Sequence, residues 1–500
     1  MNNGVTLTIS IVLIYLIGTI FIGHLAARKM QMSLLDLFVA NRSLGLLALV
    51  MSIFGSQITA FGMLSVPSIA YQQGYSIMGY LTGLASFVGT AGFFLIGYRA
   101  WLLADRYGYV TPVDFLGDRW GDNLARYVVA VLQIFLEIPY ILICGIGAGL
   151  ILSTITAGTI PYWLGALVIL LITTYVAYSG GMRGTAWTNI YQGIIMMGVI
   201  LIMMVMIFRT LGGSSEIVSK LDPKMFALSG KGPQSLGQWI PYSMLCTGLS
   251  NAVIMHLLIR NMSATSPKVI QLNCLIYPVL YGTFFFMTIS LGVWGSVAIP
   301  GLSPREAENI IPMLAERFAP VWMIGLLGAG ILSAIMSSWD GMLLAASSIF
   351  SDDLVKPILK SRGIQLSEKQ ENRISRVFIL VLSIVVYGLV LLRPATILGI
   401  STFSFAGFAC LFPSYLGALY WKRCTKWGVV VSAVTSVTFV ALCAFSVMPE
   451  WATFNMHYSA PGFILSTVLL VAVSLLTKPA PDKNIEKFFV VFEEVYEDAI

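Results

Sequence analysis

The hydroxyl side chains of Ser337 and Ser338 have the types and spacing that first suggest chemistry. They follow Ala334 by three and four positions in GILSAIMSSWDGML, so on a helix the three residues share one face. This face presents two hydroxyls and, if the helix bends, a freed carbonyl. Together with carbonyls from a second segment, these oxygens would bind a hard monovalent cation. A single membrane serine more often bonds back to its own helix, so the prediction depends on the pair.

The stretch Ser52 to Pro67, SIFGSQITAFGMLSVP, could supply those carbonyls. It lies in an apolar run of about 27 residues, long enough to cross a bilayer, yet Gly55, Ser56, Gln57, Thr59 and Gly62 interrupt it. An unwound turn in hydrocarbon leaves backbone groups unsatisfied, so it is tolerated only where it lines a cavity or packs on protein. The alternative is that these small residues only let two helices pack closely.

Two carboxylates also fall deep in apolar segments. Asp340 follows Ser337 by three residues on the same face, and Glu137 lies in FLEIPYIL. An ionised carboxylate at the centre of a bilayer costs at least about 2.5 kcal/mol, so we expect each to be functional and paired. Glu137 could contact a solute, relay a proton or stabilise packing, and the sequence does not rank these roles.

His256 and Arg260 are spaced as i and i+4 in MHLLIRNMS. We interpret them as structural donors at a cytoplasmic gate rather than metal ligands, because the chain has only three histidines. The six cysteines have no ligand spacing, and the phosphate-loop, HExxH and GxSxG motifs of soluble enzymes are missing. The sequence therefore predicts that the protein is not an enzyme.

A membrane protein must position these residues. Of 500 residues, 57% are hydrophobic, against roughly 45–50% in soluble proteins, and only 10% are charged. The Lys and Arg residues that give the net charge of +6 lie mostly between apolar segments, and this distribution argues against a nucleic-acid partner. We predict an all-α polytopic protein of the cell membrane, embedded in a lipid bilayer, with thirteen transmembrane helices. The predicted spans are 6–26, 45–71, 76–98, 124–153, 160–178, 185–208, 239–259, 271–299, 319–350, 375–392, 396–420, 427–447 and 460–477.

The distribution of Lys and Arg predicts the orientation of these spans. With the N-terminus outside, 22 of the 29 lie on the inner side, as positive-inside orientation requires. Two five-helix halves then cross in opposite directions, as in inverted-repeat transporters, and Thr247, Gly248, Ser250 and Asn251 interrupt the second half where the first is interrupted. The predicted parts are a leading helix and loop (1–44), the first half (45–210), an external loop (211–238), the second half (239–421), two trailing helices (422–477) and an acidic cytoplasmic tail (478–500).

Four stretches resemble the sodium:solute symporter family, and the likeness extends over nearly the whole chain. SIFGSQITAFGMLSVPSIAY is similar to the family's first broken helix, SGGMRGTAWTNIYQG to its fourth-to-fifth helix link, AIMSSWDGMLLAASSIFSDDL to its eighth helix, and FSFAGFACLFPSYLGALYWKRCTKWG to its tenth helix and the following loop. The resemblance implies a LeuT-like five-plus-five inverted repeat with one leading and two trailing helices. It also implies a Na+ site formed by the carbonyls of Gly55, Ile58 and Ala334 and the hydroxyls of Ser337 and Ser338.

Two positions depart from the family pattern. Many relatives have Asp where this chain has Asn189, and in members with a second sodium that Asp works with positions corresponding to Ser337, Asp340 and Gly341. Our hypothesis is that the carboxylate has moved from the predicted span 185–208 to the predicted span 319–350, with Asp340 in place of the absent acid. Relatives also often have Pro-His before the gate arginine, where this chain has Met255 before the histidine.

The expected solute is a small carboxylate or amino acid. The segments RYGYVTPVDF, EIPYI and MHLLIRNMS are most similar to the branch that carries pantothenate, proline and short monocarboxylates. No Arg or Lys lies deep in the predicted spans 45–71, 124–153, 239–259 or 319–350. A carboxylate would therefore bind through unwound amides, a half-helix N-terminus or the sodium. The expected contacts are Gln57, Thr59, Gly62, Glu137 and Asn251.

These observations predict a sodium-coupled symporter that imports its solute by alternating access. Proton coupling is the alternative mechanism, because two deep carboxylates could relay protons. A sensor built on the same fold is a different class, disfavoured because the predicted tail is too short for a signalling domain. The expected partners are the solute, Na+ and the bilayer, with no obligate protein partner.

Overall fold

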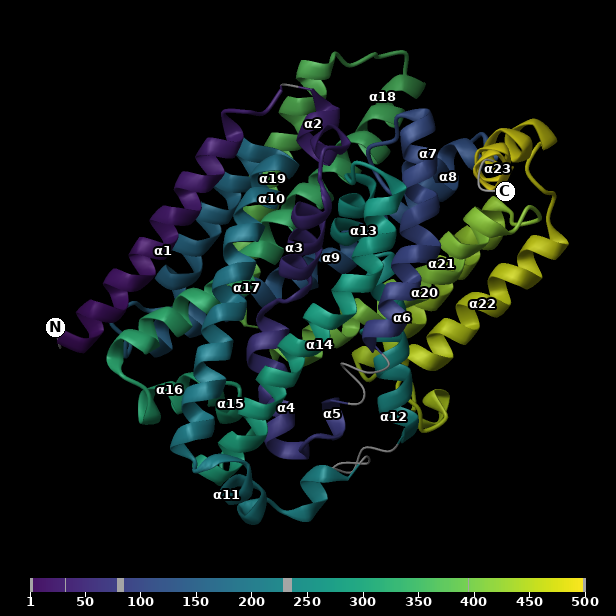
Figure 1. Ribbon diagram of the computed structural model, residues 1–500. Coiled ribbons are helices and arrows are strands. Elements are labelled where there is room, and N and C mark those ends of the chain that lie inside the picture. The colour runs from purple at the N-terminus through teal and green to yellow at the C-terminus, as the bar shows by residue number, and fades with distance from the viewer. Residues whose placement is uncertain (1–2, 32, 79–84, 228–235, 394, 498–500) are drawn as a thin grey trace.

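The computed structural model is almost entirely helical and describes residues 3–31, 33–78, 85–227, 236–393 and 395–497 (Figure 1). Parts of the predicted span 76–98, of the predicted loop and of the predicted tail lie outside these ranges. Within the described residues, ten helices are long and apolar enough to cross a membrane, or twelve if each of two bent pairs is one span. The predicted count of thirteen is therefore not confirmed.

The difference arises at α10 (Tyr162–Thr210), a single element of 49 residues where the sequence predicts two spans. A straight helix of that length would measure about 74 Å, more than twice the thickness of a bilayer core. Gly181 breaks it with φ 50° and ψ −149°, a conformation that L-residues rarely adopt. A Cβ at this position would also lie 2.6 Å from the carbonyl oxygen of Leu37. The two arms of α10 therefore meet at a glycine rather than at a loop.

Both predicted helix breaks are confirmed. The first bent pair is α3 (Leu46–Gln57) with η2 (Phe61–Ser65) and α4 (Val66–Gln73), which turn by 63° across residues 58–60. The second pair turns by 45° just before α13 (Met255–Met262). It begins with α12 (Leu236–Pro241) and continues through η6 (Tyr242–Cys246) and η7 (Leu249–Ala252).

Helix α17 (Val321–Ser348) forms the centre of the bundle. Every residue from Leu327 to Ser348 is buried, and the helix packs against α1 (Asn3–Ala27), α3, α9 (Leu124–Ile155) and α10. The other long helices are α14 (Pro267–Ala298), α19 (Glu368–Leu392), α20 (Ile397–Tyr420), α21 (Lys426–Ala444) and α22 (Ser459–Leu476).

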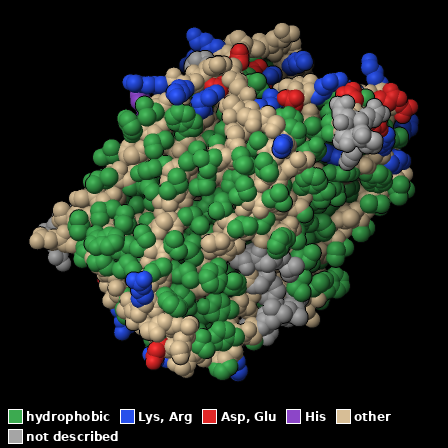
Figure 2. All heavy atoms as spheres, viewed as in Figure 1, with side chains coloured by type: hydrophobic (Ala, Val, Ile, Leu, Met, Phe, Trp, Pro, Cys, Tyr) green, Lys and Arg blue, Asp and Glu red, His purple; other side chains and the backbone are tan. Residues whose placement is uncertain are grey.

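The surface has a broad hydrophobic band, with Lys and Arg gathered mainly at one end of the molecule (Figure 2). We call this the basic end, and the helix α18 (Lys356–Ser361) lies there (Figure 1). Large apolar side chains exposed around the band suit contact with lipid. The predicted acidic tail forms the helix α23 (Asp482–Glu497) at the basic end, beside α7 (Arg99–Tyr107) and α8 (Asp114–Trp120) (Figure 1).

Candidate functional site

The first helix break brings backbone carbonyls against the middle of α17. The Ser337 hydroxyl donates a 2.7 Å hydrogen bond to the Gly55 carbonyl, and the Ser338 hydroxyl lies 3.1 Å from the Ile58 carbonyl. Both hydroxyl oxygens also lie 3.1 Å from the Ala334 carbonyl. All five oxygens of the expected Na+ site therefore converge, and each of them is uncharged.

Gly55 allows three helices to meet at this point. A Cβ there would lie 3.4 Å from Cβ of Ser337 on α17 and 3.6 Å from Cβ of Asn189 on α10. Ser56 donates to the Ser337 carbonyl at 2.7 Å and accepts from the Asn189 amide at 3.1 Å. The sequence marked Ser56 as one of the residues that interrupt this helix but did not assign it these contacts. The end of α3 is thus hydrogen-bonded to both α17 and α10.

A buried arginine lies beside the residues expected to hold a second cation. The Arg260 Nε atom donates to the Ser52 hydroxyl at 2.7 Å, and its guanidinium packs where a Cβ on Gly341 would collide with it. Asp340 is buried, accepts from the Thr188 hydroxyl at 3.3 Å and interacts electrostatically with Arg260. Of the three second-site candidates, the structure places Asp340 and Gly341 near this guanidinium.

Asn189, the third candidate, is turned elsewhere. Its amide donates to the Ser56 hydroxyl and lies 3.5 Å from the Ser52 carbonyl, so its hydrogen bonds are with α3. The carboxyl of Asp340 instead faces Thr188, one position earlier on α10. Asn189 and Asp340, the two positions of the hypothetical carboxylate exchange, therefore have different neighbours.

Glu137 and His256 form a buried pair between α9 and α13. His256 Nδ1 lies 2.5 Å from Glu137 Oε1, and both side chains are fully buried. The Tyr140 ring lies 5.6 Å from the His256 ring and 4.9 Å from the ring of Phe405 on α20. Sequence reasoning singled out Glu137 and His256 separately but missed these two aromatic residues. The His256–Arg260 pair is buried within the bundle rather than exposed in a loop.

Gln57 and Asn251 join the two broken helices. The Gln57 amide donates to the Asn251 side-chain oxygen at 2.8 Å, and the Asn251 amide donates to the Thr247 carbonyl at 2.8 Å. Thr59 accepts a hydrogen bond from the Phe61 amide, which caps the second arm of the first broken helix. These contacts bring two of the expected solute contacts together near the unwound turns.

Gly62 is not brought to the same place. A Cβ there would meet Phe285 at 3.4 Å and Phe284 at 3.6 Å, so this glycine packs against α14. It serves close packing of the second arm on α14, in line with the alternative role for small residues in this stretch.

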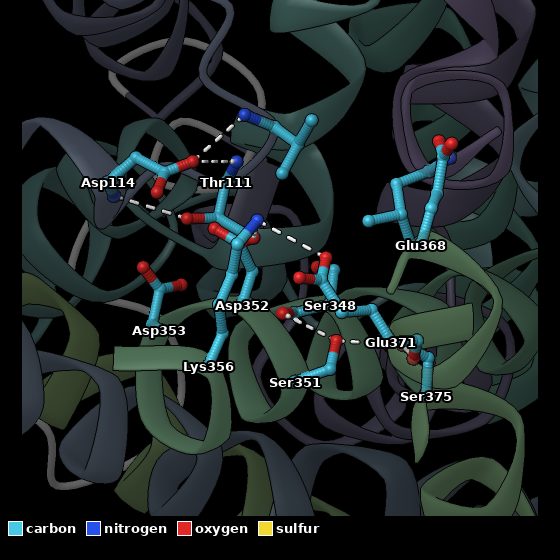
Figure 3. Close-up of polar contacts among 12 residues, drawn as sticks. Thr111, Asp114, Ser348, Ser351, Asp352, Asp353, Lys356, Glu368, Glu371 and Ser375 are labelled. Carbon is cyan, nitrogen blue, oxygen red and sulfur yellow. Dashed lines mark hydrogen bonds and ion pairs between the residues drawn. The ribbon is translucent and has the colours of Figure 1, made fainter. Parts of the chain in front are cut away.

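An ionic cluster at the basic end was not identified from the sequence. Arg126 at the start of α9 contacts Asp114 of α8 and, at 3.0 and 2.7 Å, Asp352 and Asp353 of η8 (Ile349–Val355). Lys356 lies 3.0 Å from Asp352 (Figure 3). The three carboxylates lie within 4.8 Å of one another, close enough to bind a metal ion, but the guanidinium already contacts all three. The cluster connects four segments of the chain.

Two bacterial transporters are similar to this chain in sequence over nearly its whole length. The high-affinity proline transporter PutP of Bacillus subtilis (strain 168) is 26% identical over 487 residues, which are 95% of this chain and 99% of that protein. The sodium/proline symporter of Escherichia coli (strain K12) is 25% identical over 505 residues, with 97% and 96% covered.

The fold is similar to those of solved transporters. A Na+-coupled sialic acid symporter in a substrate-bound outward-open state matches with a TM-score of 0.79 at 18% identity, over 95% of this chain and 98% of that chain. Mhp1, a nucleobase-cation-symport-1 family transporter with bromovinylhydantoin bound, matches with a TM-score of 0.54 at 13% identity, over 90% and 98%. The predicted all-α, LeuT-like fold is confirmed.

The family assignment follows from a match to most of the chain. The model of the sodium:solute symporter family matches residues 37–435, from the segment before the first broken helix into α21. The matched range contains both helix breaks and all of α17. This multi-pass membrane protein therefore belongs to the sodium:solute symporter family.

Proposed function

We propose that this sodium-coupled symporter imports a small monocarboxylate or amino acid, with proline-like and pantothenate-like solutes as the main candidates. The observation that carries the proposal is the convergence of five uncharged oxygens from the unwound turn of α3 and the middle of α17. Uncharged oxygens suit a monovalent cation, whereas calcium sites usually include carboxylates.

The proposed Na+ ligands are the carbonyls of Gly55, Ile58 and Ala334 and the hydroxyls of Ser337 and Ser338. The Gly55 and Ile58 carbonyls already lie within hydrogen-bond distance of the Ser337 and Ser338 hydroxyls on α17. An ion bound there would bridge a broken helix and a continuous one. Its arrival or departure can therefore change how the two helices pack, which is what coupling requires.

The solute contacts we propose are Gln57 and Asn251, with Thr59 and Glu137 as further members. The amide groups of Gln57 and Asn251 offer both donors and acceptors, which suits a zwitterion or a carboxylate. Arg260 donates to Ser52 and interacts electrostatically with Asp340, so we expect the solute's carboxylate to be bound by amides and by Na+. Two relatives whose names state proline transport support an amino-acid solute.

Arg260 also bears on the number of sodium ions. We propose that its guanidinium supplies the positive charge beside Asp340 and Gly341, so that one Na+ accompanies each transport cycle. The Arg260 side chain would then take the place of a second cation. Asn189 would hold the end of α3 through its hydrogen bond to Ser56.

The orientation we propose puts the N-terminus outside and the basic end in the cytoplasm, in accord with the excess of Lys and Arg there. Residues 45–210 and 239–421 would form the two inverted halves, with 1–44 leading, 211–238 outside, 422–477 trailing and 478–500 in the cytoplasm. Rocking of the first two helices of each half against α9, the first arm of α10, α17 and α19 would expose the site alternately to each side.

Proton coupling is the second candidate, and the buried Glu137–His256 pair favours it. His256 Nδ1 lies 2.5 Å from Glu137 Oε1, and this contact joins the second broken helix to α9. Transfer of a proton between the two side chains would therefore change the charges on both helices. Sodium remains the coupling ion of the family; a proton would be an addition to it.

The test is uptake into proteoliposomes with Na+ and pH gradients imposed separately. The solute panel should contain small carboxylates, amino acids including proline, and sugars. The expected result is Na+-driven accumulation of one carboxylate or amino acid with little response to a pH gradient. Accumulation of a sugar alone, or uptake driven by the pH gradient without Na+, would contradict the proposal.

A further inference from the structure

A basic cavity lies between α10 and α19 at the basic end. It has a volume of about 770 Å³ and is lined by Tyr178 of α10 and by residues of the first turns of α19, from Glu368 to Val377. Lys369, Arg373 and Arg376 are spaced as i, i+4 and i+7, so they share one helix face. None of these residues belongs to the site described above.

One of the three cations is fixed in place by protein contacts. Arg376 Nε donates to the Asn372 side-chain oxygen at 2.7 Å, and its guanidinium carbon lies 5.2 Å from the centre of the Tyr178 ring. Glu368, the acidic residue of the lining, accepts a hydrogen bond from the Leu34 amide. Its carboxylate is therefore already engaged with α2 (Leu34–Val39).

The other two cations lack an anionic partner. Lys369 and Arg373 are exposed, and the side chain of neither forms a hydrogen bond or ion pair with any other residue that the structure describes. Three like charges on one face repel one another unless an anion lies between them. The cavity thus combines a positioned guanidinium with two free cationic side chains.

The helices that form the cavity continue into an apolar surface. On α19, Val377, Val381 and Ile384 are 50%, 50% and 71% exposed, and on α10 Leu171 is 59% exposed. The two helices stay in contact along this stretch, since the Thr174 and Ser383 hydroxyls lie 2.9 Å apart. A molecule whose polar part occupied the cavity would therefore find apolar side chains on both helices beyond it.

We propose that this cavity binds the headgroup of an anionic phospholipid, with its phosphate on Lys369, Arg373 and Arg376 and its acyl chains along the apolar faces of α10 and α19. Guanidinium groups bind phosphate oxygens in pairs, and basic cavities between transmembrane helices at a cytoplasmic surface suit anionic headgroups. A zwitterionic headgroup brings its own cation into a region that is already positive. The lipid would link α19 to the first arm of α10.

The experiment uses the full chain purified in detergent. Native mass spectrometry reports bound lipid, and the unfolding temperature is measured with phosphatidylglycerol, phosphatidylcholine or inorganic phosphate added. We expect phosphatidylglycerol to remain bound and to raise Tm by about 3 °C or more, with a shift under about 1 °C from phosphatidylcholine or phosphate. Neither readout requires transport, so the result is independent of the proposed solute and coupling.

The decisive variant is K369Q/R373Q, which removes the two unpaired cations and keeps Arg376 on Tyr178. Its matched control is K360Q/R362Q, which loses the same charge from exposed residues outside the cavity. The cavity variant should lose most of the lipid adduct and of the Tm shift, and the control should keep both. If the double variant does not fold, R373Q alone should lose at least half of the shift.

Three results would overturn the proposal. The cavity variant could retain phosphatidylglycerol as well as the control does. Phosphatidylcholine could stabilise the protein as much as phosphatidylglycerol, which would mean that the headgroup charge is irrelevant. Inorganic phosphate could reproduce the full shift, which would identify a site for soluble anions rather than for a lipid.

Discussion

The Ser337 hydroxyl donates to the carbonyl of Gly55 at 2.7 Å, and this bond joins the end of the first broken helix to the middle of α17. Gly55 is among the last residues of α3, whose final four carbonyls have no partner within their own helix. The hydroxyl satisfies a carbonyl that the break has freed. The Na+ site we propose uses the same atoms, so an ion would replace one neutral contact with a charged one.

Replacing Ser338 by Ala should weaken Na+ binding. The change removes one of five proposed oxygen ligands and leaves the Ile58 carbonyl without its nearest hydroxyl. A loss of about 1–2 kcal/mol corresponds to a rise of roughly 5–30-fold in the Na+ concentration for half-maximal uptake. The measurement is the Na+ dependence of uptake in proteoliposomes at saturating solute.

The matched control is Ser333→Ala on the same helix. The Ser333 hydroxyl bonds to the Ala329 carbonyl and is not one of the proposed ligands. Its Na+ dependence should stay within about twofold of that of the unaltered protein. Equal effects of the two substitutions would mean that α17 loses stability generally and that Ser338 is not a ligand.

Replacing Gly341 by Ala should displace Arg260 from its place beside Asp340. The new methyl group would collide with the guanidinium, and overpacking of this kind costs about 1–3 kcal/mol. We expect a lower unfolding temperature and loss of most uptake. The same substitution at Gly198 is the control, because no atom lies within 4 Å of a Cβ there.

A second substitution tests whether Arg260 acts as the local cation. Lysine at position 260 is less bulky at its end and keeps the charge, so R260K/G341A should be less impaired than the sum of the two single changes predicts. Strict additivity of the two losses would argue against contact between these residues.

The sodium-to-solute ratio tests the same role independently. A ratio of two in the unaltered protein would argue against the role we propose for Arg260.

The parts of this site that sequence could predict are those determined within one segment. Gly, Ser, Gln and Thr inside an apolar run mark a break locally, and the spacing of Ser337 and Ser338 defines a helix face without reference to the rest of the fold. The position of Arg260 was not predictable in this way. Its long side chain reaches Ser52 and Gly341, which lie on two other helices.

The ionic cluster and the form of α10 show the same limit. Asp352 and Asp353 follow a hydrophobic helix and resemble a solvated helix end, and only the fold shows that Arg126 contacts both. In α10 the sequence predicts two spans, 160–178 and 185–208, but a single residue in an unusual conformation, Gly181, is enough for the turn between them. Pairing at long range and backbone geometry at one residue both depend on tertiary packing.

Replacing Glu137 by Gln should distinguish its three possible roles. The change removes the charge but keeps a side chain that can bond to His256, so we expect a loss of about 1.5–3 kcal/mol in stability at most. If the pair relays a proton, any acceleration of uptake by a pH gradient should disappear while Na+-driven uptake remains. If Glu137 contacts the solute, KM for the solute should rise instead.

The unfolding temperature and the two uptake measurements separate these outcomes. A variant with an unchanged KM, an unchanged pH response and a lower Tm would assign Glu137 to packing between α9 and α13. Phe135, on an exposed face of the same helix, offers the control substitution Phe135→Leu, which should change none of the three quantities.

Replacing Arg126 by Gln should destabilise the protein and create a site for a divalent cation. The change leaves three carboxylates within 4.8 Å of one another without the guanidinium that contacts them all, and an uncompensated buried charge costs about 3–5 kcal/mol. Calcium binds such groups of carboxylate oxygens, so millimolar Ca2+ should restore much of the lost Tm in R126Q but leave the unaltered protein within about 1 °C. Exposed Arg362 supplies the control R362Q, which should neither lose stability nor respond to Ca2+. Stabilisation of the unaltered protein by Ca2+ would show instead that the cluster binds metal alongside Arg126.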